Sequence, residues 1–98
     1  MIVEFDGEVF RWEARLDSDW YFVALPSALS DDIRETQIYR RGFGGVRVEV
    51  SIGRSVWRTS IFPQAGGVYV LPLKKAVRDA EAIEPGASVH ARLAVIGA

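Results

Sequence analysis

The sequence predicts a mainly β fold, a small single-domain barrel of about six to seven strands with two short helices. Two observations carry this prediction. Apolar and polar residues alternate with a period of two in residues 8–17, 46–52 and 88–96, which is typical of strands with one buried face. Glycine or proline interrupts the apolar stretches at short intervals, and many short strands whose edges need partners favour a closed barrel over an open sheet.

Chain length and composition limit what the domain can be. The 98 residues, 49% hydrophobic and 26% charged, are enough for one domain over residues 1–98 with one core. Cysteine is absent, which excludes disulfides, thiolate metal ligands and a thiol nucleophile. The first residues include acidic side chains from Glu4 onward, which is not the pattern of a signal peptide. The longest apolar run, residues 20–25, is far shorter than the ~20 residues of a membrane span. We therefore expect a cytoplasmic protein without a membrane partner.

Three strands are expected near the N-terminus. Residues 2–5 and 8–17 are predicted as two strands, joined by a hairpin at Asp6-Gly7. Residues 20–25 are continuously apolar, which is typical of a strand covered on both faces.

A short helix is expected over residues 30–37. Ser27 or Ser30 can cap its N-terminus. Asp31 and Asp32 would then lie in the first turn, where the helix dipole favours negative charge.

A β-hairpin is predicted in the middle of the chain. Residues 46–52 and 55–62 are its strands, and Gly53-Arg54 is a two-residue loop. Glycine at the first position of such a loop indicates a type II′ turn.

The hydrophobic pattern also fixes the register of this hairpin. A two-residue loop pairs Val50 with Trp57 on the buried face and Glu49 with Arg58 on the outer face. A three-residue loop would pair Val50 with Arg58 and mix the two faces. Register follows the buried pattern, so the two-residue loop is preferred.

The C-terminal third is expected to hold two strands and a helix. Residues 68–71 form a short strand, and Pro72 suits the first position of a helix over residues 73–82. Residues 88–96 alternate as a last strand with His90 on its polar face.

Five blocks of the sequence form a recognisable pattern: WYFVALP at residues 20–26, GFGGVRV at 42–48, WRTSIFP at 57–63, YVLPLKKAVR at 69–78 and GASV at 86–89. Together they resemble a bacterial family catalogued as domain of unknown function 1905, in which relatives usually have Gly-Asp at the start of the last block. The resemblance spans nearly the whole chain. It implies a small β-barrel with two helices, and no activity, because none is established for the family.

Charge is strongly segregated along the chain, although the total is only −1. Residues 1–39 carry a net −6 and residues 40–78 a net +7. Such asymmetry can mark a surface for an anion, and the candidate binding residues are Arg40, Arg41, Arg47, Arg58, Lys74, Lys75 and Arg78. The alternative is that acidic and basic strands neutralise one another inside one barrel, as Glu49 and Arg58 would.

Lys74, Lys75 and Arg78 break local helix rules. Lysines in the first turn oppose the helix dipole, and Lys74 and Arg78 are like charges four residues apart. Two violations in one place are expected at a functional site.

The sequence offers little for catalysis. His90 is the single histidine, and no signature links it to the candidate hydroxyls of Thr59 and Ser60. No metal-ligand spacing is present. Phe10, Trp12 and Trp57 fall on the apolar faces of their strands, whereas Phe62 falls on the outer face beside Arg58.

These observations predict a non-enzymatic binding module without cofactor or metal. Its basic face, within residues 40–78, would receive an anionic small molecule or an acidic protein surface. A nucleic acid is compatible with the charge but supported by no motif. The alternative is a structural or interaction protein that assembles through charge-segregated faces, so the chain is expected as a monomer or a homodimer. The third hypothesis is an enzyme that uses the hydroxyl group of Thr59 or Ser60.

Overall fold

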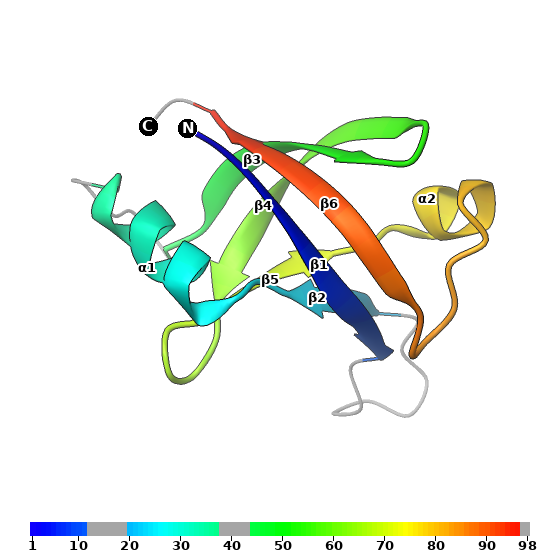
Figure 1. Cartoon of the computed structure of the whole chain (residues 1–98), viewed down its shortest axis with the longest axis horizontal. Helices are drawn as coiled ribbons and strands as arrows, with labels where there is room; N and C mark the ends of the chain where they lie inside the picture. The colour runs from blue at the N-terminus through cyan, green and yellow to red at the C-terminus, as the bar shows by residue number, and fades with distance from the viewer. Residues whose placement is uncertain (12–19, 38–43, 97–98) are drawn as a thin grey trace.

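Six antiparallel strands close into one barrel in the order β1-β2-β5-β4-β3-β6, with two short helices (Figure 1). The computed structural model describes residues 1–11, 20–37 and 44–96. The elements are β1 (Ile2–Arg11), β2 (Tyr21–Ala24), α1 (Ser27–Glu35), β3 (Val46–Ile52), β4 (Ser55–Pro63), β5 (Tyr69–Pro72), α2 (Lys75–Ala80) and β6 (Ser88–Val95). The predicted fold class is therefore confirmed. The predicted strand residues 12–17 lie outside the described residues.

The predicted hairpin at Asp6-Gly7 is wrong, because β1 runs through it as one strand. Asp6 pairs with His90 and Gly7 with Val89 along an uninterrupted ladder with β6. A Cβ atom at Gly7 would collide with the side chain of Val23 and lie 3.3 Å from the carbonyl oxygen of Ala24. Glycine here allows a close approach of β2 to β1 and does not make a turn.

The buried face of β1 also differs from the prediction. Val3, Phe5 and Val9 point into the barrel, so the alternation leaves Phe10 on the outer face. Phe10 is half-buried there, with its ring centroid 6.0 Å from that of Phe22. The predicted inward position of Phe10 is therefore wrong, and Trp12 lies beyond the described part of β1.

The β3–β4 hairpin is confirmed in register and in turn type. Val50 pairs with Trp57 and Glu49 with Arg58. Gly53 has a φ of 57°, while Arg54 is not among the residues with positive φ. A positive φ at the first loop position alone is the type II′ pattern. Trp57 is buried in the core, as its place in the alternation predicts.

Helix α1 starts three residues earlier than predicted. Pro26 occupies the N-cap position with a φ of −55° and a ψ of 146°, and no side chain caps the helix. The helix begins at Ser27, so Asp31 and Asp32 lie beyond its first turn. The predicted capping role of Ser27 or Ser30 is therefore wrong, because Pro26 occupies the N-cap position and both serines lie inside the helix.

Ser30 instead helps to fasten α1 to the barrel. Its buried hydroxyl accepts a hydrogen bond of 3.0 Å from the backbone N–H of Tyr69. Arg34 donates to the carbonyl oxygen of Gly67 and lies 5.8 Å from the centre of the Tyr69 ring. Ile33 is completely buried in the core. Helix α1 therefore covers one end of the barrel, and α2 lies at the other end (Figure 1).

Helix α2 is shorter than predicted, because strand pairing continues past Pro72. Pro72 pairs with Phe22 as the last residue of β5. The N–H of Leu73 then donates to the carbonyl oxygen of Tyr21 at 2.8 Å. The helix starts only at Lys75, after Lys74 in an extended conformation, so the predicted start at Pro72 is wrong.

The core lies inside the barrel and is closed by one side chain from each helix. The buried residues of β6 are Val89, Ala91 and Leu93, and its exposed residues include His90, as the alternation predicts. Val77 of α2 is buried at the opposite end from Ile33. Within the described ranges, neither helix is long and apolar enough to cross a membrane.

Candidate functional site: an aromatic crevice with a cationic rim

The shortest ladder of the barrel joins β4 to β5. β4 has nine residues, but only two of them pair with β5, in the pairs Phe62–Val70 and Pro63–Tyr69. On its other side, β4 pairs with β3 from Ser55 to Ile61. The first part of β4 therefore diverges from β5.

Pro72 gives a physical reason for this divergence. If the ladder that pairs Phe62 with Val70 continued, Pro72 would lie opposite Ser60. Proline has no N–H to donate to a strand ladder. The chain then leaves the sheet and enters α2 at Lys75. The ladder ends here, and a gap opens between β4 on one side and the β5–α2 segment on the other.

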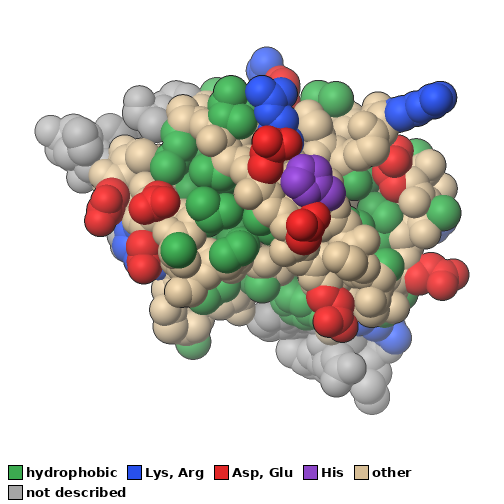
Figure 2. Space-filling view, in the orientation of Figure 1, with side chains coloured by type: hydrophobic (Ala, Val, Ile, Leu, Met, Phe, Trp, Pro, Cys, Tyr) green, Lys and Arg blue, Asp and Glu red, His purple; other side chains and the backbone are tan. Residues whose placement is uncertain are grey.

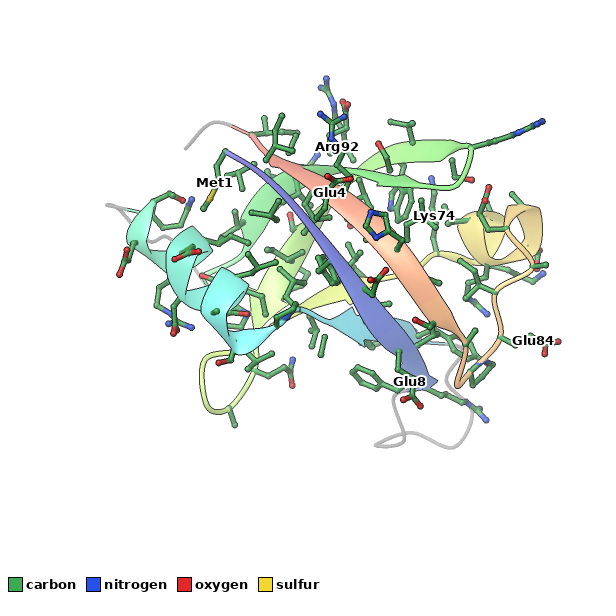
Figure 3. The ribbon with its side chains drawn as sticks, in the orientation of Figure 1. Met1, Glu4, Glu8, Lys74, Glu84 and Arg92 are labelled. Atoms are coloured by element: carbon green, nitrogen blue, oxygen red, sulfur yellow. The ribbon has the colours of Figure 1, made fainter. Side chains whose placement is uncertain are left out.

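A crevice of about 730 Å³ occupies this gap and the adjoining outer surface of β2, β4 and β5. Five aromatic side chains line it: Trp20, Tyr21, Phe22, Trp57 and Phe62. Four cationic side chains line it as well: Arg58, Lys74, Lys75 and Arg78. Lys74 lies at the point where the chain passes from β5 to α2 (Figure 3).

The aromatic residues leave substantial apolar surface open to solvent. Trp20 is 63% exposed and Phe62 is 41% exposed. Trp20 contacts Phe22 edge-on, with the ring centroids 6.3 Å apart. The ring of Phe62 lies above Gly45, where a Cβ atom would come within 3.1 Å of it. Exposed apolar surface that is clustered and bordered by charge marks a binding site more often than scattered exposed residues do.

The four cations of the rim are not equivalent. Arg78 is half-buried, stacks over the ring of Tyr21 at 4.0 Å, and donates through Nε to the carbonyl oxygen of Leu73 at 3.2 Å. These contacts fix α2 to β2 and to the end of β5. Arg78 is therefore a structural residue of the crevice wall, as well as a charge.

Two further rim cations are paired with acids. The Nζ of Lys75 lies 2.8 Å from Asp79, and this hydrogen bond lowers the pKa of the Asp79 carboxyl group. Arg58 lies 3.3 Å from Glu49 on the outer face of the hairpin. These pairs agree with the alternative interpretation of the charge map for Arg58 and Lys75. Lys74 is exposed, and the described part of the chain shows no acid paired with it.

The position of α2 is set by the hairpin that it faces. Glu81, directly after α2, accepts a hydrogen bond of 2.8 Å from the hydroxyl group of Ser55. Its carboxylate also fills the space beside Gly53, where a Cβ atom would collide with it. Val77 and Ile83 are buried. The wall of the crevice is therefore anchored at both ends of α2.

The sequence predicted some of these residues and missed others. Arg58, Lys74, Lys75 and Arg78 are brought together, as the basic segment predicts. Arg47 is exposed on β3 and does not line the crevice. Arg40 and Arg41 lie outside the described residues.

The missed residues are Trp20, Tyr21 and Phe22. Their run was interpreted as a strand covered on both faces, yet Trp20 is exposed and Phe22 is only half-buried. A usable signal was present, because Trp20 and Phe22 are two residues apart and therefore share one face of a strand.

His90 belongs to a separate surface on β1 and β6. Its Nδ1 lies 2.8 Å from Asp6, and its Nε2 lies 3.3 Å from Glu4. These hydrogen bonds, that with Asp6 first, raise the pKa of His90. Figure 2 shows the histidine side chain between acidic side chains on this face, and Figure 3 shows Glu4 next to Arg92, its partner in the strand register.

The candidate hydroxyl group of Thr59 and the ring of His90 lie on different surfaces. Thr59 lines the crevice, whereas His90 does not. Among the described residues, no group of three or more histidine, cysteine, aspartate or glutamate side chains could hold a metal ion.

Fold and site together define a small closed barrel of six antiparallel strands, with an aromatic, basic crevice where two strands diverge. A family model described as a domain of unknown function, DUF1905, matches residues 5–93, so the chain belongs to this family. The match confirms the family resemblance of the sequence blocks. No curated protein matches the chain.

Proposed function

We propose that the domain is a non-enzymatic binding module whose crevice receives an anionic ligand with an apolar body. One observation carries the proposal: exposed aromatic side chains and cationic side chains line the same hollow of about 730 Å³. Ligand sites commonly have volumes of about 300–1,000 Å³, with apolar walls and a few polar groups that fix orientation.

The two kinds of side chain would have different tasks. Trp20, Phe22 and Phe62 offer rings against which an apolar or planar group can pack. Lys74 would supply a point charge beside this surface, and Arg58 a planar fork suited to carboxylate or phosphate. An anion near apolar walls is attracted more strongly than one in open water, because the walls reduce screening.

The lining of the crevice favours binding over acid–base chemistry. Among the described residues, those around it include no aspartate, glutamate or histidine. Thr59 is therefore without an imidazole or carboxylate base in the crevice that could activate its hydroxyl group.

A matched pair of fluorescent probes tests the proposal. 8-Anilinonaphthalene-1-sulfonate and N-phenyl-1-naphthylamine share their ring system and differ in the sulfonate. The sulfonated probe is expected to bind more tightly, with an affinity that falls as salt is added. Lys74→Gln should weaken the sulfonated probe by about fivefold, because one charged contact is lost, and leave the neutral probe unchanged.

Two variants complete this experiment. Phe62→Ser should weaken both probes, because it removes a ring of the wall. Arg92→Gln is the matched control, since Arg92 is an exposed cation on β6 outside the crevice. Equal effects of Lys74→Gln and Arg92→Gln on the sulfonated probe would mean that overall charge, and not the crevice, attracts the anion.

Assembly through charge-segregated faces is the second candidate function. It is favoured by the acidic side chains of Glu4 and Asp6 on the β1–β6 face, opposed in sign to the crevice rim. An assembly held by these charges should dissociate as salt is raised, because the Debye length falls to about 3 Å at 1 M. Sedimentation velocity at low and high salt checks this, and a monomer under both conditions would exclude it.

A further inference from the structure

Among the described residues, the part of β4 from Val56 to Arg58 has no strand partner on the side of β5. In a hairpin with a two-residue loop, the residues flanking the loop exchange hydrogen bonds, here Ile52 and Ser55. Hydrogen-bonded and non-hydrogen-bonded pairs then alternate, so Trp57 directs its backbone groups to β3. Val56 and Arg58 direct their N–H and C=O groups to the other side.

The far end of β4 confirms this assignment of sides. The N–H of Gln64 donates to the carbonyl oxygen of Val68 at 2.8 Å, on the β5 side. Even-numbered residues of β4 therefore face β5. The register with β5 includes Phe62 but neither Val56 nor Arg58.

The two residues of this edge are exposed, and one of them, Arg58, lies at the crevice. Val56 is 62% exposed and Arg58 is also exposed. Arg58 itself lines the crevice, and Lys74 and Lys75 line it from the opposite wall. An unpaired strand edge is a template for another strand, and here the template is next to aromatic and cationic side chains.

We propose that the ligand of the crevice is an acidic peptide segment that adds to the edge of β4 as an extended strand. This inference rests on the proposed function and specifies its ligand. Backbone pairing would come from Val56 and Arg58. Side chains on one face of the peptide would pack toward Trp57 in the crevice, and side chains on its other face would lie beside Arg58.

Charge favours an acidic peptide over a second copy of the chain, which would bring two basic edges together. If two β4 edges paired antiparallel about a two-fold axis through Arg58, the two Arg58 side chains would face each other. Like charges directly opposite each other destabilise a strand pair. Acidic side chains in the added strand would instead meet Arg58 on one side and Lys74 on the other.

Binding of a synthetic peptide tests the inference. The probe is the capped pentapeptide acetyl-Glu-Phe-Glu-Phe-Glu-amide, and its control is the same peptide with every backbone nitrogen methylated. The control keeps charge and side chains but has no backbone N–H to donate, and its N-methyl groups prevent close approach to the edge of β4. The parent peptide is expected to bind at least about tenfold more tightly than the methylated control, because the control loses about two backbone hydrogen bonds.

Amide hydrogen exchange on the ¹⁵N-labelled domain locates the added strand. The parent peptide should slow exchange of the Val56 and Arg58 amides, and the methylated control should not. Equal affinity of the two peptides, or no protection at Val56 and Arg58, would overturn the added strand while leaving anion binding by the crevice intact. Protection of these amides that rises with protein concentration alone would overturn it in favour of a second copy of the chain.

The two proposals can fail separately in these experiments. Binding of the sulfonated probe without binding of the peptide would refute the peptide and keep the anionic crevice. Failure of both ligands would refute both.

Discussion

The two sides of the barrel are built differently. On one side, β1 pairs with β6 and β3 pairs with β4 along seven residue pairs each. On the other side, β2 pairs with β5 over three residue pairs and β5 with β4 over two. Long ladders leave apolar residues inside and charged residues such as Glu4 and Arg92 outside. Where the ladders are short, aromatic residues reach the outer surface and a crevice forms.

This comparison indicates where a small barrel can accommodate a site. On the long-ladder side, backbone N–H and C=O groups pair between neighbouring strands, and this pairing stabilises the fold. On the short-ladder side, Pro72 cannot donate a backbone hydrogen bond to β4, and the pairing of β5 with β4 stops at Val70. The end of α2 is fastened to the start of β4 by the contact of Glu81 with Ser55. Three experiments sharpen the comparison, from the largest expected effect to the smallest.

The largest effect is expected from Trp57→Ala. Trp57 is 8% exposed within the core, so its truncation should lower the free energy of unfolding by roughly 3–5 kcal/mol. Trp20→Ala removes the same side chain from a position that is 63% exposed, and should cost under about 1 kcal/mol. Chemical denaturation measures both, and equal losses would contradict the assignment of Trp57 to the scaffold and Trp20 to the crevice.

Gly53→Ala should have an intermediate effect. Gly53 has a φ of 57°, and an added Cβ atom would collide with the carboxylate of Glu81. The expected loss is about 1 kcal/mol or more in the free energy of unfolding. Gly86→Ala is the control, because Gly86 has a φ of 87° with open space around it. A larger loss for Gly86→Ala in thermal or chemical unfolding would contradict a role of Glu81 in placing α2.

The smallest effect on stability is expected from replacing His90, which is exposed on the long-ladder side. Its pKa is raised in the folded chain by hydrogen bonds to Asp6 and Glu4. The resulting stability is therefore fully present below the ordinary value of 6.5 and is lost as pH rises through the raised pKa. His90→Gln should lose this pH dependence in chemical denaturation.

NMR titration of the His90 ring provides the more sensitive measurement. Asp6→Asn should bring the pKa of His90 closer to 6.5 than Glu4→Gln does, because the contact with Asp6 is shorter, 2.8 Å against 3.3 Å. A pKa that neither variant changes would show that these side chains do not contact His90 in solution.

The sequence allowed local features to be predicted where their cause is local. The β3–β4 hairpin follows from a clean alternation and from one glycine, and its pairing of Val50 with Trp57 is confirmed. Gly7 and Pro72 were misinterpreted as turn and helix signals. The role of Gly7 depends on Val23, which packs against it from another strand, and Pro72 pairs with Phe22 across the sheet.

The candidate site divides in the same way. Charge segregation along the chain indicated Arg58, Lys74, Lys75 and Arg78. These four cations come from one strand and one helix that are near each other in the sequence, and they also lie close together in space. The aromatic wall of the crevice could not be predicted from the charge pattern. Trp20 reaches the crevice only because β2 lies next to β5, a neighbour distant in sequence.

A chemical-shift map of the ¹⁵N-labelled domain, titrated with 8-anilinonaphthalene-1-sulfonate, tests the central claim most directly, that the crevice is where an anion binds. The account predicts the largest shift changes at the Trp20 indole and at the amides of Arg58 and Lys74, which line the crevice. The amides of His90 and Arg92, on the long-ladder side, should not move. Changes that are centred on β1 and β6, or spread evenly over all exposed cations, would contradict it.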